Sequence, residues 1–180
     1  VNWQGAISNE EIVGGQSIWE GIQTLAPSAV LSDNLEGNEA NPDQHDVAIV
    51  VIGETPYAEM LGDIRVPGLL QEYSTFPNST PIPLDDSEVA EVYASNLYLH
   101  EMHPEDIATI NNITSRGVPV VAVMLGGRPL VVEKELEASS AFVMAWLPGS
   151  EGHGVADVLF GDFDIQGKLS FSWPKYDNEN

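Results

Sequence analysis

Glu54 stands at a position where a general acid could work. It directly follows the apolar run 46–53, so its carboxyl is expected to lie against apolar side chains. Burial against apolar groups raises the pKa of a carboxyl, which is how a glutamic acid stays protonated near neutral pH and donates a proton. The common alternative is a strand-end glutamate that caps a loop or pairs with an arginine. Position alone leaves both roles open.

Two further acids and one arginine also follow apolar runs. Glu59 and Asp63 lie in the same segment as Glu54 and could supply a second carboxylate or bind the hydroxyl groups of a ligand. Arg128 follows two glycines and precedes a proline, after a second apolar run at 118–127. It could clamp Glu54, Asp63 or a ligand, and an ion pair that organises the loops is the favoured role.

Other common catalytic and metal-binding patterns are absent from the sequence. The chain has no cysteine, which excludes disulfides, thiolate catalysis and cysteine-based metal sites. His100 and His103 lack a third ligand at a spacing typical of zinc sites. Ser150 is not in a G-x-S-x-G pattern, and the glycine-rich stretch 149–154 matches no phosphate loop and places Glu151 where it would repel phosphate. The sequence predicts no metal and no cofactor, and it favours tight packing of a strand against a helix as the role of these glycines.

Short β-branched apolar runs alternate with helix-like stretches along the chain. Runs that are apolar on both faces are typical of interior strands in a parallel sheet covered by helices on each side. Strands are expected at 46–53, 118–127, 141–146 and 168–173, and helices at 16–25, 104–115 and 150–160. This order predicts an α/β fold, a three-layer α/β/α sandwich with a mostly parallel sheet and a flavodoxin-like appearance. Since sites in such sheets lie at the carboxyl ends of strands, Glu54 and Arg128 are expected at one edge.

Two stretches do not fit this alternation. Residues 33–46 contain five acids and few apolar residues, so they are expected to form a solvated loop. Residues 62–86 are rich in proline and show no clear period. They predict a long loop or insertion at about 64–99, which is either a functional loop or a variable surface excursion.

The chain as a whole is strongly acidic. Its 180 residues carry 28 acidic side chains against 6 Lys and Arg, a net charge of −22. This charge argues against nucleic acid or an anionic membrane as a partner, since either would be repelled, and no run approaches the ~20 apolar residues of a membrane span. The start at Val1 has no initiator Met and no recognisable signal peptide, so a processed product or a fragment is expected.

Five motifs follow one another in a fixed order along the chain. They lie at 50–63, 127–132, 145–152, 155–162 and 167–174, and the Trp-Gln-Gly of residues 3–5 precedes them. In this order they resemble the C-terminal domain of family 3 glycoside hydrolases. The resemblance covers nearly all of the chain, as one domain over 1–180, except about 65–99.

The resemblance implies one lobe of a larger enzyme. Members of the family join an N-terminal (β/α)8-like barrel to an α/β sandwich, and they are retaining, exo-acting β-glucosidases and β-glucan hydrolases that release glucose from non-reducing ends. The barrel supplies the nucleophile, so none is expected in this chain, whereas the sandwich supplies the acid/base, which the resemblance assigns to Glu54. Glu59 is then expected to support the site or to structure its loop.

Partners and location are also implied by the resemblance. A β-glucan or β-glucoside oligosaccharide and the barrel domain are the expected partners, in a secreted or periplasmic enzyme. The chain alone is expected to be inactive because the nucleophile lies on the other domain.

Two other classes of function remain open at this point. One is a non-catalytic carbohydrate-binding or scaffolding lobe of the same fold, which the Glu54 segment argues against. The other is a receiver or nucleotide-binding domain, which would place a lysine at the end of an apolar strand. Lys134, Lys168 and Lys175 are the three lysines, and none of them immediately follows such a strand.

Overall fold

The protein forms a parallel three-stranded sheet in the computed structural model, which describes residues 12–54 and 97–176. The strands are β1 (Ala48–Gly53), β2 (Val120–Leu125) and β3 (Ala141–Trp146), in the spatial order β1-β2-β3. All pairings are parallel, with Ala48 opposite Val120 and Val121 opposite Ala141. Three of the four predicted strands are therefore confirmed, each within two residues of the expected bounds.

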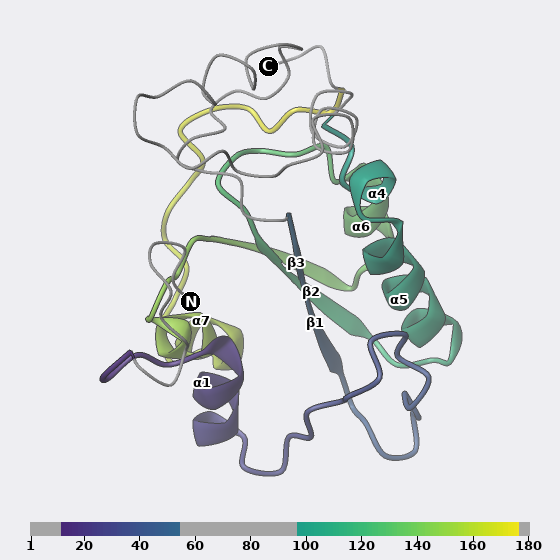
Figure 1. The fold of residues 1–180 in the computed structure, drawn as a ribbon, viewed down its shortest axis with the longest axis vertical. Coiled ribbons are helices and arrows are strands. Elements are labelled where there is room, and N and C mark those ends of the chain that lie inside the picture. The colour runs from purple at the N-terminus through teal and green to yellow at the C-terminus, as the bar shows by residue number, and fades with distance from the viewer. Residues whose placement is uncertain (1–11, 55–96, 177–180) are drawn as a thin grey trace, which may run out of the picture.

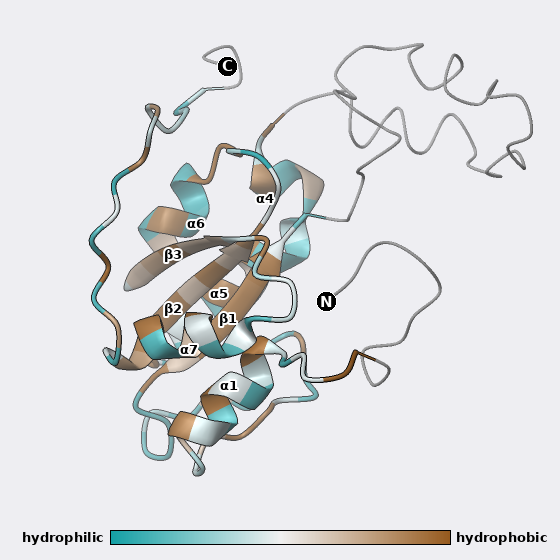
Figure 2. Cartoon of the chain, turned by 90° about the vertical axis from the view of Figure 1, so that its left-hand side faces the viewer, coloured by the Kyte–Doolittle hydropathy of each residue, from teal (hydrophilic) through white to brown (hydrophobic). Residues whose placement is uncertain are grey.

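Helices cover both faces of this sheet (Figure 1). On one side lie α1 (Ile18–Leu25) and α7 (Gly152–Phe160), and on the other lie α4 (Leu99–Met102), α5 (Pro104–Ser115) and α6 (Glu133–Ala138). The predicted three-layer α/β/α sandwich is confirmed. Figure 2 shows the apolar strands enclosed between these helices.

The three predicted helices are confirmed: α5 has the expected bounds, and α1 and α7 end where expected but begin two residues later. At the start of α1, Ser17 and Glu20 form a reciprocal capping box. Helix α5 opens with Pro104 at its first position, and α7 ends at Gly161 in the left-handed conformation, with φ 82°. Helices α4 and α6 were not predicted because four and six residues are too few to show a helical period.

The main hydrophobic core lies between the sheet and helices α4, α5 and α6. Alternate residues of β1 and β2 point into it, as expected for the two-residue period of a strand. Its buried members are Ile52, Leu97, Leu99, Ile110, Ile113, Val118, Val120, Ala122, Met124, Leu130, Val131 and Val132. This core fixes β1 and β2 side by side, and with them the segments that follow the two strands.

Helices α1 and α7 pack closely through glycines. A Cβ added to Gly21 would lie 2.9 Å from the Gly152 carbonyl oxygen, and one added to Gly152 would collide with the backbone of Ser17. The backbones of Gln16 and Glu151 also pair as a parallel bridge. Tight packing is thus the observed role of Gly152, although the close partner is another helix.

The fourth predicted strand, at 168–173, is wrong. These residues form no strand, and Leu169 and Phe171 are 52% and 43% exposed. Their alternating pattern suggested a half-buried strand, but the rings of Phe171 and Trp173 pack against Trp146 instead. Aromatic packing accounts for the apolar residues here.

The acidic stretch 33–46 is a loop of turns and bends, as expected. It is fixed to α5, because the Thr109 hydroxyl donates to the Leu35 carbonyl at 2.6 Å and the Asn112 amide donates to the Glu36 carbonyl at 2.6 Å. Most of the predicted insertion at 64–99 lies outside the described residues, which resume at Leu97. In the described ranges, no helix is both long and apolar enough to cross a membrane.

Candidate active site

Glu54 and Arg128 form an ion pair where β1 and β2 end. Arg128 Nε donates to Glu54 Oε2 at 2.9 Å, and the side chains of Arg128 and Glu54 are 17% and 3% exposed respectively. Neighbouring parallel strands bring their carboxyl ends to one edge of the sheet, so residues far apart in the sequence meet here. Of the partners considered for Arg128, Glu54 lies beside it, and Asp63 lies outside the described residues.

Glu54 is held by its backbone and by both carboxylate oxygens. Its amide donates to the Leu125 carbonyl at 3.3 Å, and its Oε1 accepts from the Gly127 amide at 3.3 Å. A guanidinium and a backbone amide thus each occupy one oxygen of the carboxylate. These are the contacts of an anchored ion pair, and a role for Glu54 in proton transfer stays a prediction.

Gly53 allows β1 and β2 to approach closely just before this pair. A Cβ at Gly53 would collide with the carbonyl oxygen of Leu125. At Gly126 a Cβ would be 3.6 Å from Glu54 Oε1, which is ordinary contact. The glycine at position 53 is therefore required by the approach of the two strand ends, whereas Gly126 has room for a methyl group.

Trp146, at the end of β3, contacts the same turn of β2. Its carbonyl oxygen accepts from the Gly126 amide at 3.2 Å. The pairing of β2 with β3 is irregular here, since Leu125 lies opposite Trp146 and Ala145 is skipped. Trp146 has φ 57° and is the one non-glycine residue with positive φ in the described part of the chain. All three strand ends are thus linked at one edge of the sheet.

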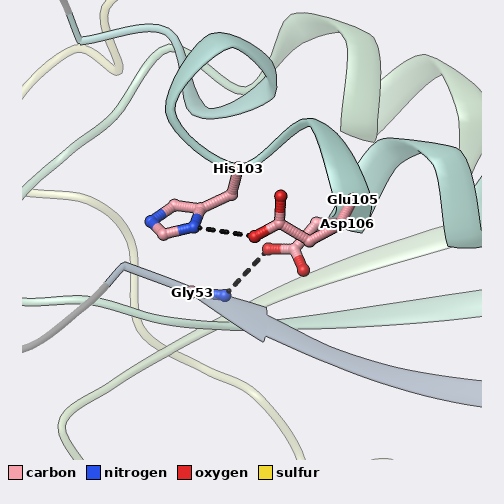
Figure 3. A network of polar contacts seen from close by, with 4 residues as sticks. All are labelled: Gly53, His103, Glu105 and Asp106. Carbon is pink, nitrogen blue, oxygen red and sulfur yellow. Dashed lines mark hydrogen bonds and ion pairs between the residues drawn. The ribbon is translucent and has the colours of Figure 1, made fainter. Parts of the chain in front are cut away.

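Asp106 approaches the end of β1 from helix α5 (Figure 3). Its carboxylate accepts a long hydrogen bond, 3.5 Å, from the Gly53 amide, while His103 Nδ1 lies 3.1 Å from Glu105 Oε1. Burial raises the pKa of Asp106, and the Gly53 amide and nearby His103 oppose that shift. The sequence analysis missed Asp106, although an acid in the first turn of a predicted helix was visible.

Glu135 is a second buried carboxyl that the sequence analysis missed. The residue is 0% exposed, and within residues 12–54 and 97–176 neither of its carboxylate oxygens has a hydrogen-bond partner. Burial raises its pKa, and the charge of Asp106 adds to the increase. Its position in a short helix full of acids gave no sign of burial.

The remaining predicted positions do not add a second carboxylate to the described site. Glu59 and Asp63 lie outside the described residues. The part of the chain that the structure describes, which includes His100 and His103, holds no group of three or more His, Cys, Asp or Glu side chains that could bind a metal ion. Burial lowers the pKa of His100, and the charge of Lys134 lowers it further. The charge of Glu101 opposes this shift.

Comparison with known proteins places this geometry in a family. Residues 2–180 match the family described as "Glycosyl hydrolase family 3 C-terminal domain". The chain belongs to this family. The family membership expected from the five motifs is confirmed.

Individual relatives agree with this membership. The chain is 27% identical to the lysosomal beta glucosidase of Dictyostelium discoideum, over 97% of the chain and 19% of that protein. It is 28% identical to the periplasmic beta-glucosidase of Salmonella typhimurium, over 86% of the chain and 16% of that protein. The chain therefore spans less than a fifth of these curated relatives.

Solved structures show the same fold. The exo-1,3/1,4-beta-glucanase of a Pseudoalteromonas species superposes with a TM-score of 0.64 at 35% identity, covering 97% of this chain and 19% of that one. The beta-glucosidase of Listeria innocua, solved in complex with glucose, gives a TM-score of 0.61 at 23% identity, covering 92% of this chain and 20% of that one. The second likeness concerns the fold alone.

Proposed function

We propose that this chain is the acid/base-bearing lobe of a retaining, exo-acting β-glucosidase or β-glucan hydrolase. The observation that carries the proposal is the linked edge of the sheet, where the end of β1 is fixed by Arg128 and Gly127 within a family of glycoside hydrolases. The substrate is a β-glucoside or β-glucan oligosaccharide. An N-terminal barrel domain supplies the nucleophile.

The chemistry needs one carboxyl that first donates and then accepts a proton. In a retaining mechanism it protonates the leaving glycosidic oxygen while a second carboxylate attacks the anomeric carbon, and it then deprotonates the water that releases the sugar. The two carboxyls stand about 5–5.5 Å apart in such enzymes. The segment after β1 is the place where this lobe can present an acid to a sugar held by a second domain.

Two glutamates on that segment are candidates, and the contacts of Glu54 favour a division of labour between them. A general acid must carry a proton and touch the leaving oxygen. Glu54 has a 3% exposed side chain with both oxygens already accepting hydrogen bonds, one from a guanidinium. We therefore assign proton transfer to Glu59 and the anchoring of the segment to Glu54, in place of the role that the sequence predicts for Glu54.

Leaving-group dependence in the intact enzyme tests this assignment. Glu59→Gln should slow glucosides with poor leaving groups about 10²–10⁴-fold and activated aryl glucosides far less, because only the former need protonation. Glu54→Gln is the matched variant and should slow both classes by a similar factor. The reverse pattern would return the acid/base role to Glu54, and equal losses for both variants would remove it from the two residues.

Turnover by the 180-residue chain alone tests the division between two domains. The chain should not hydrolyse an aryl β-glucoside, because its nucleophile lies elsewhere. A rate close to that of an intact family enzyme would contradict this. Sugar binding without turnover by the intact protein would instead favour a non-catalytic carbohydrate-binding lobe.

The location of the enzyme is proposed from the names of its relatives. One is called periplasmic and another lysosomal. We place the enzyme outside the cytosol, secreted or periplasmic, where polymeric glucans are accessible. Fractionation of cells that produce it, followed by activity measurement in each fraction, tests this location.

A further inference from the structure

Two tryptophans that the proposed function does not use meet at the edge of the sheet that carries Arg128. Trp146 ends β3, and Trp173 lies in the C-terminal segment, with ring centroids 5.8 Å apart. Phe171 completes the cluster, at 6.2 Å from Trp146 and 6.3 Å from Trp173. Such aromatic contacts stabilise by about 0.5–1.5 kcal/mol each beyond simple burial.

Each tryptophan bonds to the backbone on one side of Arg128. The Trp146 carbonyl accepts from the Gly126 amide at 3.2 Å, and Trp173 Nε1 donates to the Leu130 carbonyl at 2.7 Å. Gly126 and Leu130 lie two residues before and two residues after Arg128. Segment 126–130 is therefore held at one end by the Trp146 backbone carbonyl and at the other by the Trp173 indole, and the rings of the two tryptophans pack against each other.

The backbone of Trp146 is strained in a way that serves this contact. For an L-residue the left-handed conformation costs roughly 1–2 kcal/mol, and tryptophan has none of the local hydrogen bonds with which Asn or Asp offset that cost. Its φ of 57° coincides with the irregular pairing to Leu125 and with the bond to Gly126. Strain of this kind persists where surrounding contacts hold it, and it concentrates at functional sites.

We propose that Trp146 and Trp173 are positioning residues for the active site. They brace segment 126–130 so that Arg128 Nε reaches Glu54 Oε2 and fixes the end of β1. Neither tryptophan needs to touch the sugar. The effect on catalysis rests on the proposed function, in which the segment after β1 bears the acid/base. The contacts of the two tryptophans with segment 126–130 do not depend on that function.

The ion pair can be observed directly in the 180-residue chain by NMR. The chain has three arginines, Arg65, Arg116 and Arg128, so it gives three Nε–H signals, and Arg128→Lys identifies the one of interest. Trp173→Phe keeps a ring in the cluster and removes the donor to Leu130. The Arg128 Nε–H should then exchange with solvent about fivefold faster, the change expected for the loss of one hydrogen bond of about 1 kcal/mol.

A control variant separates the brace from general loosening of the cluster. Phe171→Leu alters the same aromatic group without a bond to 126–130, and it should leave the exchange of the Arg128 Nε–H unchanged. An unchanged rate in a folded Trp173→Phe chain would overturn the proposal, as would equal acceleration in both variants. If Trp173→Phe does not fold, Trp173→Tyr, which also keeps a ring and removes the indole donor to Leu130, is measured in its place with the same expectation.

Kinetics of the intact enzyme test the consequence for catalysis. Trp173→Phe should lower kcat about tenfold on glucosides with poor leaving groups, with a smaller loss on activated ones and little change in KM, because misplacing the acid weakens proton transfer. Equal losses on both substrates would contradict a positioning role. If the intact protein has no glucosidase activity, the proposed function fails, while the NMR measurement still decides whether the brace exists.

Discussion

At the scale of single residues, the buried acids differ most in the hydrogen-bond and ion-pair partners that stabilise their carboxylates. Glu54 has an arginine and an amide as partners, and Asp106 has one long hydrogen bond from Gly53. The carboxylate of Glu135 has no hydrogen-bond partner among the residues that the structure describes. An ionised carboxyl without partners is costly to bury. Glu135 is therefore the residue at which proton uptake should affect stability most visibly.

Replacing Glu135 with glutamine should stabilise the protein at neutral pH. The pKa of Glu135 is raised on folding, so its ionisation opposes folding once the pH exceeds the value of the unfolded chain. This destabilisation disappears as the pH falls and Glu135 becomes protonated in both the folded and the unfolded protein. Glu135→Gln should raise Tm at pH 7, with each kcal/mol appearing as about 2–4 °C, and should match the parent near pH 3.

Glu137→Gln is the control for this measurement because Glu137 is an exposed acid on the same helix. It should leave the pH dependence of Tm close to that of the parent. If the Tm values of the parent and of Glu135→Gln differ by the same amount at pH 3 and at pH 7, ionisation of Glu135 is not the cause of the difference in stability.

At the scale of elements, the sequence predicted the strands and helices whose formation depends on local residue patterns. The β-branched runs indicated β1, β2 and β3, and the helix-like stretches between them indicated α1, α5 and α7. The predicted strand at 168–173 was wrong because Phe171 and Trp173 pack as rings and not as one face of a strand. Pattern alone does not distinguish these two uses of alternating apolar residues.

The contact of α1 with α7 gives a prediction at this scale. Gly152→Ala places a methyl group against the backbone of Ser17, so the helices must separate. Overpacking of this kind typically costs about 1–3 kcal/mol, which chemical denaturation would measure. Gly154→Ala, on the same helix with nothing within 4 Å of the added Cβ, should be neutral or slightly stabilising. Equal destabilisation by both changes would contradict this prediction, because helix propensity favours alanine over glycine at both positions and the added methyl groups meet a close contact only at Gly152.

The candidate site was predictable only in part, because some of its contacts depend on how separate elements pack together. A parallel sheet brings successive strand ends to one edge, which is enough to place Arg128 near Glu54. Burial of Glu135 and the bond from Trp173 to Leu130 depend on how separate elements pack. No periodicity within either segment encodes those contacts.

At the scale of the whole molecule, a net charge of −22 means that the folded chain repels itself. Compact like charges destabilise the folded state relative to an expanded one. Salt reduces this repulsion, since the Debye length falls from about 10 Å at 0.1 M to about 3 Å at 1 M. Tm should therefore rise between 0.05 and 0.5 M NaCl, roughly the concentrations over which screening becomes effective.

A second salt separates screening from ion binding. KCl should give the same increase as NaCl, because screening depends on ionic strength and not on the identity of the cation. The buried pair of Glu54 and Arg128 should contribute little to the salt effect, as buried charges are screened much less. A Tm that falls with salt would mean that attractive surface pairs outweigh the repulsion.

Helix α1 packs against α7, which lies near the other end of the described chain. Contacts between segments so far apart in sequence form only after a large loop has closed, so they favour late assembly during folding. The main core, by contrast, is built from segments that include the nearly consecutive α5 and β2. Helices α1 and α7 should therefore detach as one cooperative unit, and a protease cut that frees either helix would leave the other unprotected while the rest of the sheet stays folded.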